Sequence, residues 1–271
     1  MTEIDEKVAV VTGAGSGIGR ALAIALAARN CPLSLCDVDR EGLAETVRMA
    51  ERSNVRITPH IVDTSNRDQM EKFAADTIAE HGRADLIFNN AGVTLVESVE
   101  DMKYDDFEWV MNINFWGMVY GTKAFLPHLK ERGNGHITNV SSLFGILSVP
   151  TQAAYNSSKF AIRGFTESLR WEMSETGIGV TSVHPGGIKT NIVRSSRFYK
   201  DSEGHTDHDA MSRRFENLAR LTPEQAAAVI LKGVEKGNPR ILVGADAKIL
   251  DLAQRMFPRA YGRVVGWLFG R

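Results

Sequence analysis

Residues 8–19 read Val-Ala-Val-Val-Thr-Gly-Ala-Gly-Ser-Gly-Ile-Gly, and this stretch decides the fold. A short β-branched run ends in a glycine cluster, and a helix-compatible segment at residues 17–30 follows directly. Glycines at 13, 17 and 19 remove the side chains that would hold the backbone away from a pyrophosphate. Free N–H groups and the positive end of the helix dipole attract such an anion. The stretch therefore predicts a dinucleotide-binding turn; the alternative is a tight turn without a ligand.

The second apolar run, residues 33–36, ends at Asp37. A carboxylate at this place can accept hydrogen bonds from both ribose hydroxyls of an adenosine, and it repels a 2′-phosphate. The alternative role, capping the next helix, fits Asp39 better. The order strand, glycine turn, helix, strand and acid strengthens the dinucleotide prediction and favours NAD over NADP.

The rest of the chain continues the alternation of short apolar runs and helix-length segments. The runs are apolar throughout, which is typical of parallel strands buried on both faces. Strands are predicted at 8–11, 33–36, 55–62, 85–88, 136–140, 180–183 and 240–243, and helices at 17–30, 41–52, 67–81, 105–131, 153–175 and 223–236. The pattern predicts an α/β fold of Rossmann type, with a doubly wound, seven-stranded, mainly parallel sheet and helices on both faces. One domain is expected to span residues 1–271.

Two segments depart from this alternation. Residues 189–221 are polar and longer than an ordinary connection, so we expect a lid over the substrate site. Residues 248–271 form an amphipathic tail. In residues 255–271 four arginines and no acid are interleaved with apolar and aromatic side chains, a composition typical of a segment that lies on a membrane surface. The alternative is that the tail packs at a subunit interface.

Composition limits the classes of protein that the chain can belong to. Its 32 basic and 33 acidic residues give a net charge of −1, so no global field draws it to nucleic acid. Two cysteines, Cys31 and Cys36, exclude a disulfide scaffold and are expected to be core thiols. No secretory signal and no run long enough for a spanning helix is found. The expected location is the cytoplasm, with peripheral membrane contact through the tail as a further hypothesis.

Tyr155 and Lys159 stand four residues apart in a helix-compatible run, which places them on one helix face. Because a neighbouring ammonium stabilises a phenolate, the pKa of Tyr155 is expected well below its usual value of about 10. Ser142 follows the strand at 136–140, at the edge where open α/β sheets bind ligands. Singly, the pair is common on solvated helix faces and the serine is an ordinary turn residue.

Together these features resemble the short-chain dehydrogenase/reductase (SDR) family, in its single-domain branch. The matched motifs are Thr-Gly-Ala-Gly-Ser-Gly-Ile-Gly at 12–19, Asn-Asn-Ala-Gly at 89–92, Asn-Phe-Trp-Gly at 114–117, Ser142, Tyr-x-x-x-Lys at 155–159 and Pro-Gly-Gly-Ile-Lys-Thr at 185–190. They follow the family's order from residue 8 to about residue 190.

The resemblance implies a catalytic set of four residues and requires no metal. Tyr155 would be the general acid and base, and Lys159 would lower its pKa and hold the nicotinamide ribose. Ser142 would orient the substrate oxygen, and Asn114 would support a water in a proton relay. Asn112 is a nearby rival, but Asn114 has the family's spacing to the glycine that follows.

The same resemblance implies how the cofactor is held. Asp63 would hold the adenine, Asn90 would border the adenosine ribose, and Ile188 and Thr190 would contact the carboxamide. The complete expected cofactor-binding set is Gly13, Ser16, Gly17, Ile18, Gly19, Asp37, Asp63, Asn90, Gly92, Tyr155, Lys159, Pro185, Gly186, Ile188 and Thr190.

NAD is expected because Ser16 and Val38 stand where NADP-binding relatives usually place Arg or Lys; Arg40 argues the other way. Residues that are expected to give the pocket an apolar wall, or else to pack in the core, are Phe144, Ile146, Leu147 and Val149. The predicted reaction interconverts a lipophilic secondary alcohol and a ketone of steroid-, retinoid- or long-chain-like type. The alternatives are an NADPH-dependent 3-oxoacyl thioester reductase and a non-catalytic dinucleotide sensor or scaffold. A homodimer or homotetramer is implied by the resemblance.

Overall fold

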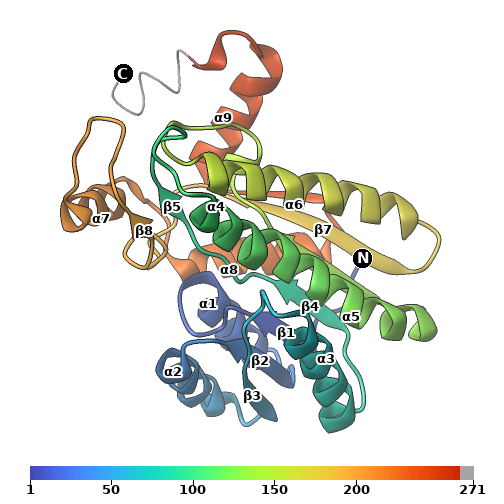
Figure 1. The fold of residues 1–271 in the computed structure, drawn as a ribbon. Coiled ribbons are helices and arrows are strands. Elements are labelled where there is room, and N and C mark those ends of the chain that lie inside the picture. Colours follow the sequence, from blue (N-terminus) through green and yellow to red (C-terminus); the bar gives the residue numbers. More distant parts are fainter. Residues whose placement is uncertain (263–271) are drawn as a thin grey trace.

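A computed structural model describes residues 1–262 of the chain (Figure 1). Within that range a seven-stranded sheet has the order β3-β2-β1-β4-β6-β7-β9, and every pairing in it is parallel. The strands are β1 (Ala9–Thr12), β2 (Leu33–Asp37), β3 (Ile57–Ile61), β4 (Leu86–Asn89), β6 (Gly135–Val140), β7 (Ile178–Pro185) and β9 (Arg240–Val243). The strand order reverses between β1 and β4, which makes that point the topological switch of the sheet.

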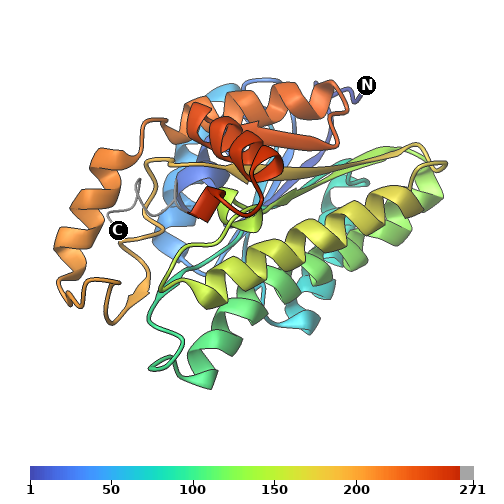
Figure 2. The same ribbon diagram turned by 90° about the horizontal axis from the view of Figure 1, so that it is seen from above.

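Helices cover both faces of the sheet, as Figure 2 shows. The helices are α1 (Gly17–Ala27), α2 (Arg40–Ala50), α3 (Arg67–His81), α4 (Tyr104–Met111), α5 (Gly117–Arg132), α6 (Ala153–Glu172), α7 (His208–Leu218), α8 (Pro223–Glu235) and α9 (Ala245–Met256). One apolar cluster joins the sheet to α1, α2 and α8, and a second joins it to α3, α5 and α6. The predicted doubly wound α/β fold is confirmed, and the sheet is wholly parallel.

The predicted helix at 105–131 is divided in the structure. A π-helical turn, Asn112–Trp116, separates α4 from α5 and carries Asn114 into the interior, where its side chain is fully buried. Sequence periodicity does not detect one extra residue in a turn, because α4 and α5 continue the same amphipathic pattern. The predicted helix at 153–175 ends earlier, at Glu172.

The segment at 189–221 is more ordered than the polar loop that the sequence predicts. It contains α7 and a short strand, β8 (Arg197–Phe198), which pairs with β5 (Leu95–Val96) beside the main sheet. The Arg197 guanidinium lies 2.6 Å from the Asp106 carboxylate and 4.0 Å from the Trp109 ring centroid. These contacts fasten the segment to α4.

The C-terminal tail falls partly outside the described residues. Its first part forms α9, whose exposed side carries Ile249, Leu252 and Met256, while residues 263–271 lie outside the range that the structure describes. Among residues 1–262, no helix is long and apolar enough to cross a membrane. Cys31 and Cys36 are buried free thiols, as predicted.

Candidate active site

The residues that the sequence singles out lie along one edge of the sheet. The glycine turn follows β1, Asp37 ends β2, Asp63 follows β3, and Asn90 follows β4. Ser142 follows β6, and Pro185 ends β7. Because the strands are parallel, their carboxyl ends meet at this edge, on both sides of the switch point between β1 and β4.

The glycine turn has a backbone that side chains would disrupt. Gly13 and Gly17 have φ angles of +66° and +51°, in the left-handed region that favours glycine. A β-carbon on Gly19 would lie 2.0 Å from the Gly13 carbonyl oxygen. Ser16, at the N-cap of α1, makes no side-chain capping bond within the described chain. The first N–H groups of α1 can therefore serve an anion, and the turn fits a pyrophosphate.

Two charged side chains hold this turn in shape. The Asp37 carboxylate accepts a hydrogen bond from Gly15 N at 2.7 Å. The Arg20 guanidinium donates to Gly15 O from the other side, and its Nε donates to Thr46 Oγ1 at 3.0 Å. This bracing role of Asp37 and Arg20 is not predictable from the sequence, because it connects α1 and β2 through contacts that no local pattern encodes.

The capping prediction for Asp39 is confirmed. Its carboxylate accepts hydrogen bonds from Glu41 N and Gly42 N at the start of α2, at 3.1 Å each. Asp37 takes no part in this cap; its Oδ1 accepts from Asp39 N at 2.9 Å, beside the glycine turn. Val38 is 65% exposed between the two acids, which agrees with its place at the edge of a binding site.

The loops after β3 and β4 bring further predicted residues to the edge. Asn90 donates from Nδ2 to Thr12 O at 3.0 Å and to Gly13 O at 3.2 Å, so it ties β4 to the glycine turn. Asp63 is exposed and accepts from Ser65 N at 2.9 Å, which shapes the turn before α3. Asn90 therefore borders the glycine turn, and Asp63 lies at the same edge of the sheet.

The loop after β7 approaches the glycine turn from the opposite side. A β-carbon on Gly17 would lie 3.2 Å from Thr190 Cγ2, so Thr190 lies against the start of α1. Gly187 N donates to the Asp246 carboxylate at 2.7 Å, which fastens this loop to the first turn of α9. The side chain of Ile188 is buried in the main apolar cluster. The predicted contact between Ile188 and the cofactor stays a prediction.

Because Gly92 has no side chain, it leaves a narrow space beside two predicted catalytic residues. A β-carbon at this position would lie 3.3 Å from both Asn114 Oδ1 and Lys159 Nζ. Asn114 itself is held firmly, because its Nδ2 donates to Val93 O at 2.9 Å and its Oδ1 accepts from Val93 N at 2.8 Å. The space at Gly92 is thus a cradle that any larger side chain would fill, with an ammonium and an amide at its wall.

Ser142, Tyr155 and Lys159 are brought together by β6 and α6, and all three are buried. Lys159 Nζ donates to Val140 O at 3.0 Å and lies 5.5 Å from the Tyr155 ring centroid. Ser142 Oγ accepts from Phe144 N at 3.1 Å, and the Tyr155 hydroxyl hydrogen-bonds to the Ser142 side chain. A hydroxyl pair and an ammonium therefore share one buried corner next to Gly92.

Burial decides the acid strengths in this corner. It raises the pKa of Tyr155 to about 12, although the hydrogen bond to Ser142 acts in the opposite direction. Burial also lowers the pKa of Lys159 to about 8. The expectation that Lys159 brings the pKa of Tyr155 well below 10 is therefore wrong for the chain alone. The loss of hydration of a buried phenolate raises the pKa by more than the hydrogen bond to Ser142 lowers it.

The residues expected to wall the pocket divide into two groups. Leu147 is fully buried and clusters with Leu250 on α9, and Ile146 is also buried, so these two form core rather than pocket wall. Phe144 and Val149 are half-buried, and the Phe144 ring meets the Tyr155 ring edge-on with centroids 6.3 Å apart. The alternative of core packing is thus correct for half of the predicted wall.

Comparison with known proteins gives the site a family context. Residues 7–200 match the family model described as short chain dehydrogenase. The Mycobacterium tuberculosis protein named "Putative oxidoreductase SadH" is 44% identical over 267 residues, which cover 98% of this chain and 96% of that protein.

Solved structures agree in fold. A short chain dehydrogenase/reductase from Burkholderia phymatum in complex with NAD is 28% identical, with a TM-score of 0.86 over 94% of this chain and 96% of that chain. A short chain dehydrogenase from Mycobacterium paratuberculosis bound to NAD is also 28% identical, with a TM-score of 0.76 over 89% of this chain and 97% of that chain. The matched family region contains the glycine turn and the buried corner of Ser142, Tyr155 and Lys159. The chain therefore belongs to the short-chain dehydrogenase/reductase family of oxidoreductases.

Proposed function

We propose that the protein is an NAD-dependent oxidoreductase that interconverts a secondary alcohol and a ketone. The observation that carries this proposal is the placement of Tyr155, Ser142 and Lys159 in one buried corner beside the space at Gly92. An acid–base hydroxyl, a second hydroxyl and a cation at one point are the groups that carbonyl reduction needs.

Residues from several loops would hold the cofactor. The turn of Gly13–Gly19 would bind the pyrophosphate, and Asp37 would accept from the adenosine ribose, with Asp63 and Asn90 around the adenosine. Gly92, Lys159 and the loop residues Pro185, Gly186 and Thr190 would border the nicotinamide half. When bound, the cofactor supplies the hydride acceptor or donor. The choice of NAD is supported by the Asp37 charge and by the NAD bound in two related structures.

The chain's own residues would handle the proton. Near neutral pH Tyr155 is protonated, so it can donate to the oxygen of a ketone as the carbon is reduced. Ser142 would donate a hydrogen bond to the same oxygen. Lys159 is largely protonated at pH 7 and would stabilise the phenolate that is left. In the oxidation direction the phenolate would take the alcohol proton, and Asn114 would support the relay that returns it to solvent.

The substrate class rests on the half-buried apolar surface beside Tyr155. The Phe144 ring meets the Tyr155 ring, Val149 is also half-buried, and the segment at 189–221 would close over them as a lid held by Arg197. We propose a lipophilic alcohol or ketone of steroid-, retinoid- or long-chain-like type. An NADPH-dependent 3-oxoacyl thioester reductase is the alternative reaction, and a dinucleotide-binding sensor is the non-enzymatic one.

A turnover assay tests the proposal. Purified protein is assayed with NAD and NADP on steroid, retinoid and long-chain secondary alcohols, and with NADH and NADPH on the matching ketones and on 3-oxoacyl thioesters. Turnover of a lipophilic alcohol with NAD is the expected result. Turnover of thioesters with NADPH would favour the alternative reaction, and dinucleotide binding without turnover of any compound would favour a sensor.

The exposed face of α9 bears on the proposed partners. Ile249, Leu252 and Met256 recur at helical spacing and are 56–64% exposed, and Lys248 and Arg255 flank them. A second subunit and an anionic membrane surface both fit such a face. Co-sedimentation with anionic vesicles, for the full chain and for a chain ending at Gln254, separates them. Membrane contact requires that the full chain binds the vesicles and the truncated chain does not. A subunit interface requires that the truncated chain loses its oligomeric state.

A further inference from the structure

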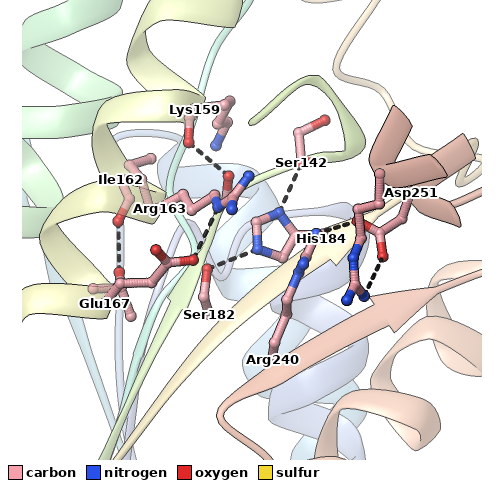
Figure 3. A network of polar contacts seen from close by, with 12 residues as sticks. Ser142, Lys159, Ile162, Arg163, Glu167, Ser182, His184, Arg240 and Asp251 are labelled. Carbon is pink, nitrogen blue, oxygen red and sulfur yellow. Dashed lines mark hydrogen bonds and ion pairs between the residues drawn. The ribbon is translucent and has the colours of Figure 1, made fainter. Parts of the chain in front are cut away.

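A buried histidine contacts the backbone carbonyl of Ser142, the serine of the active-site corner. His184 lies on β7 with its side chain fully buried, and Figure 3 shows its ring between Ser142 and Ser182. Its Nδ1 is 3.0 Å from the Ser142 carbonyl oxygen, and its Nε2 is 3.0 Å from Ser182 Oγ. The sequence gives no signal for this residue, since one histidine inside an apolar strand has no pattern that distinguishes it from core.

The partners of His184 determine which ring nitrogen carries the proton. A carbonyl oxygen can only accept, so Nδ1 carries the hydrogen and donates it to Ser142 O. Burial lowers the pKa of His184 to about 4, which keeps the ring neutral near pH 7. In the neutral ring Nε2 carries no hydrogen and accepts from the Ser182 hydroxyl. The ring therefore donates to the carbonyl of Ser142 in one fixed tautomer.

This bond completes a row of anchors at the end of β6. Val140 O accepts from Lys159 Nζ, and Ser141 Oγ donates to Lys159 O at 2.7 Å. Ser142 O accepts from His184 and also from Gly145 N at 2.9 Å, which uses both lone pairs of that oxygen. Three consecutive residues are thus anchored, two to α6 and one to β7.

The geometry points to His184 as a positioning residue for the reaction. We propose that its hydrogen bond fixes the peptide of Ser142, so that the serine hydroxyl stays directed at Tyr155 and at the substrate oxygen. The proposal rests on the proposed function, because it gives Ser142 the task of polarising that oxygen. A misplacement of a catalytic group by about 1 Å can lower the rate roughly a hundredfold. Fixing the backbone of Ser142 should therefore have a measurable effect on kcat.

A pair of substitutions separates the donated bond from mere filling of the core. In His184→Asn the amide nitrogen can take the place of Nδ1 and still donate to Ser142 O. In His184→Gln the amide lies near the place of Nε2, so the contact with Ser182 is kept and the bond to Ser142 is lost. We expect kcat to fall roughly ten- to a hundredfold in the glutamine variant. The asparagine variant should keep kcat within about threefold, and KM for the dinucleotide should change little in either.

A second buried histidine provides the matched control. His136 lies on β6 at the opposite end of the sheet, is 1% exposed, and has its pKa lowered to about 4 by burial, as His184 does. Its ring nitrogens contact Thr2 Oγ1 and Thr181 Oγ1, each at 2.8 Å. His136→Asn and His136→Gln should lower the midpoint of thermal unfolding by a similar amount while leaving kcat unchanged.

Amide hydrogen exchange at Phe144 and Gly145 gives a readout without turnover, since both N–H groups bond to Ser142. Exchange should accelerate in His184→Gln and stay slow in His184→Asn. Unchanged kcat together with unchanged exchange in the glutamine variant would overturn the proposal. Faster exchange in a protein that turns over no substrate would instead remove the proposed function and leave the His184 contact standing. If the glutamine variant does not fold, His184→Leu, which fills a similar volume and donates no hydrogen bond, should lower kcat in the same direction; an unchanged kcat there would overturn the proposal.

Discussion

The two edges of the sheet are built from the same strands but differ in the functional groups that lie there. The amino edge has a hollow of about 540 Å³, lined in part by Met1, Arg29 and Glu235, and the Arg29–Asp5 ion pair lies in it. Arg29, which follows α1, pairs there with both Asp5 of the N-terminal segment and Glu235 of α8. The carboxyl edge holds the glycine turn, the space at Gly92 and the buried hydroxyl corner.

The direction of the chain explains this difference. In a parallel sheet every strand enters at the amino edge and leaves at the carboxyl edge, so helix N-termini gather only at the latter. At that edge free N–H groups and partial positive charge are available to an anionic cofactor. A buried histidine occurs at both edges, but only at the carboxyl edge does it contact a residue of the proposed catalytic set.

The largest effect is expected at Tyr155. Tyr155→Phe keeps the ring and removes the hydroxyl that exchanges the proton, so kcat should fall by roughly 10²–10⁴. Dinucleotide affinity and the unfolding midpoint should change little, because the rest of the corner is retained. Steady-state kinetics and titration calorimetry measure the two quantities. Tyr120→Phe, on α5, is the control, and a Tyr155→Phe protein that keeps kcat within a few-fold would exclude the acid–base role.

Glycines at the two edges offer a direct contrast. Gly19→Ala places a β-carbon where only 2.0 Å separates it from Gly13 O, so the turn must deform. NAD affinity should fall roughly a hundredfold, or about 3 kcal/mol. Gly133 has a φ of +62° and no atom of the described chain within 4 Å of its β-carbon position. Gly133→Ala should cost about 1 kcal/mol of stability through backbone strain and leave NAD affinity unchanged. Equal losses of affinity in both variants would contradict the division between the edges.

The parts of the fold that local sequence patterns encode are predictable from the sequence. The strand run at 240–243 and the helix at 67–81 match β9 and α3 residue for residue, because apolar runs and helical spacing are local signals. The glycine turn and the pairing of Tyr155 with Lys159 are local in the same sense. Their meeting at one edge follows from the parallel topology, and the structure places them there.

The remainder depends on contacts between distant segments. The π-helical turn at Asn112–Trp116 arises where Asn114 bonds to Val93, a partner in another loop. The bracing of the glycine turn by Asp37 and the contact of His184 with Ser142 also join separate elements. The acid strength of Tyr155 depends on burial, which spacing along one helix does not report. Each of these features depends on the packed fold and cannot be predicted from local sequence patterns.

The buried ammonium of Lys159 predicts how stability depends on pH. Burial lowers its pKa from the usual 10.5 to about 8, so between these values the unfolded chain holds a proton that the folded chain has released. The free energy of unfolding should therefore rise with pH across this window, by about 3 kcal/mol for this group. Lys159→Met removes the penalty, although it also loses the hydrogen bond to Val140 O. The variant should be the more stable protein at pH 7, and the difference should shrink toward pH 10.5.

Chemical denaturation at pH 7, 8.5 and 10.5 measures this trend, with Lys123→Met on the exposed surface of α5 as the control. Groups away from Lys159 titrate alike in both proteins, so the difference between parent and Lys159→Met reports mainly the buried ammonium. A constant difference across the three pH values would contradict a lowered pKa at this site.

The smallest effect is expected at Asp37, where two roles can be separated. Its carboxylate braces Gly15 N and, in the proposed complex, accepts from the adenosine ribose and repels a 2′-phosphate. Asp37→Ala should weaken NAD binding about tenfold through both losses, and so narrow the preference for NAD over NADP. Asp37→Asn keeps an oxygen that can accept from Gly15 N but removes the charge. It should retain most of the NAD affinity while binding NADP more tightly than the parent does. Titration of both variants with both dinucleotides separates the bracing role of the carboxylate from the role of its charge. A parent protein that binds NADP more tightly than NAD would refute the role of Asp37 in cofactor choice. Arg40 would then be the candidate that determines this choice.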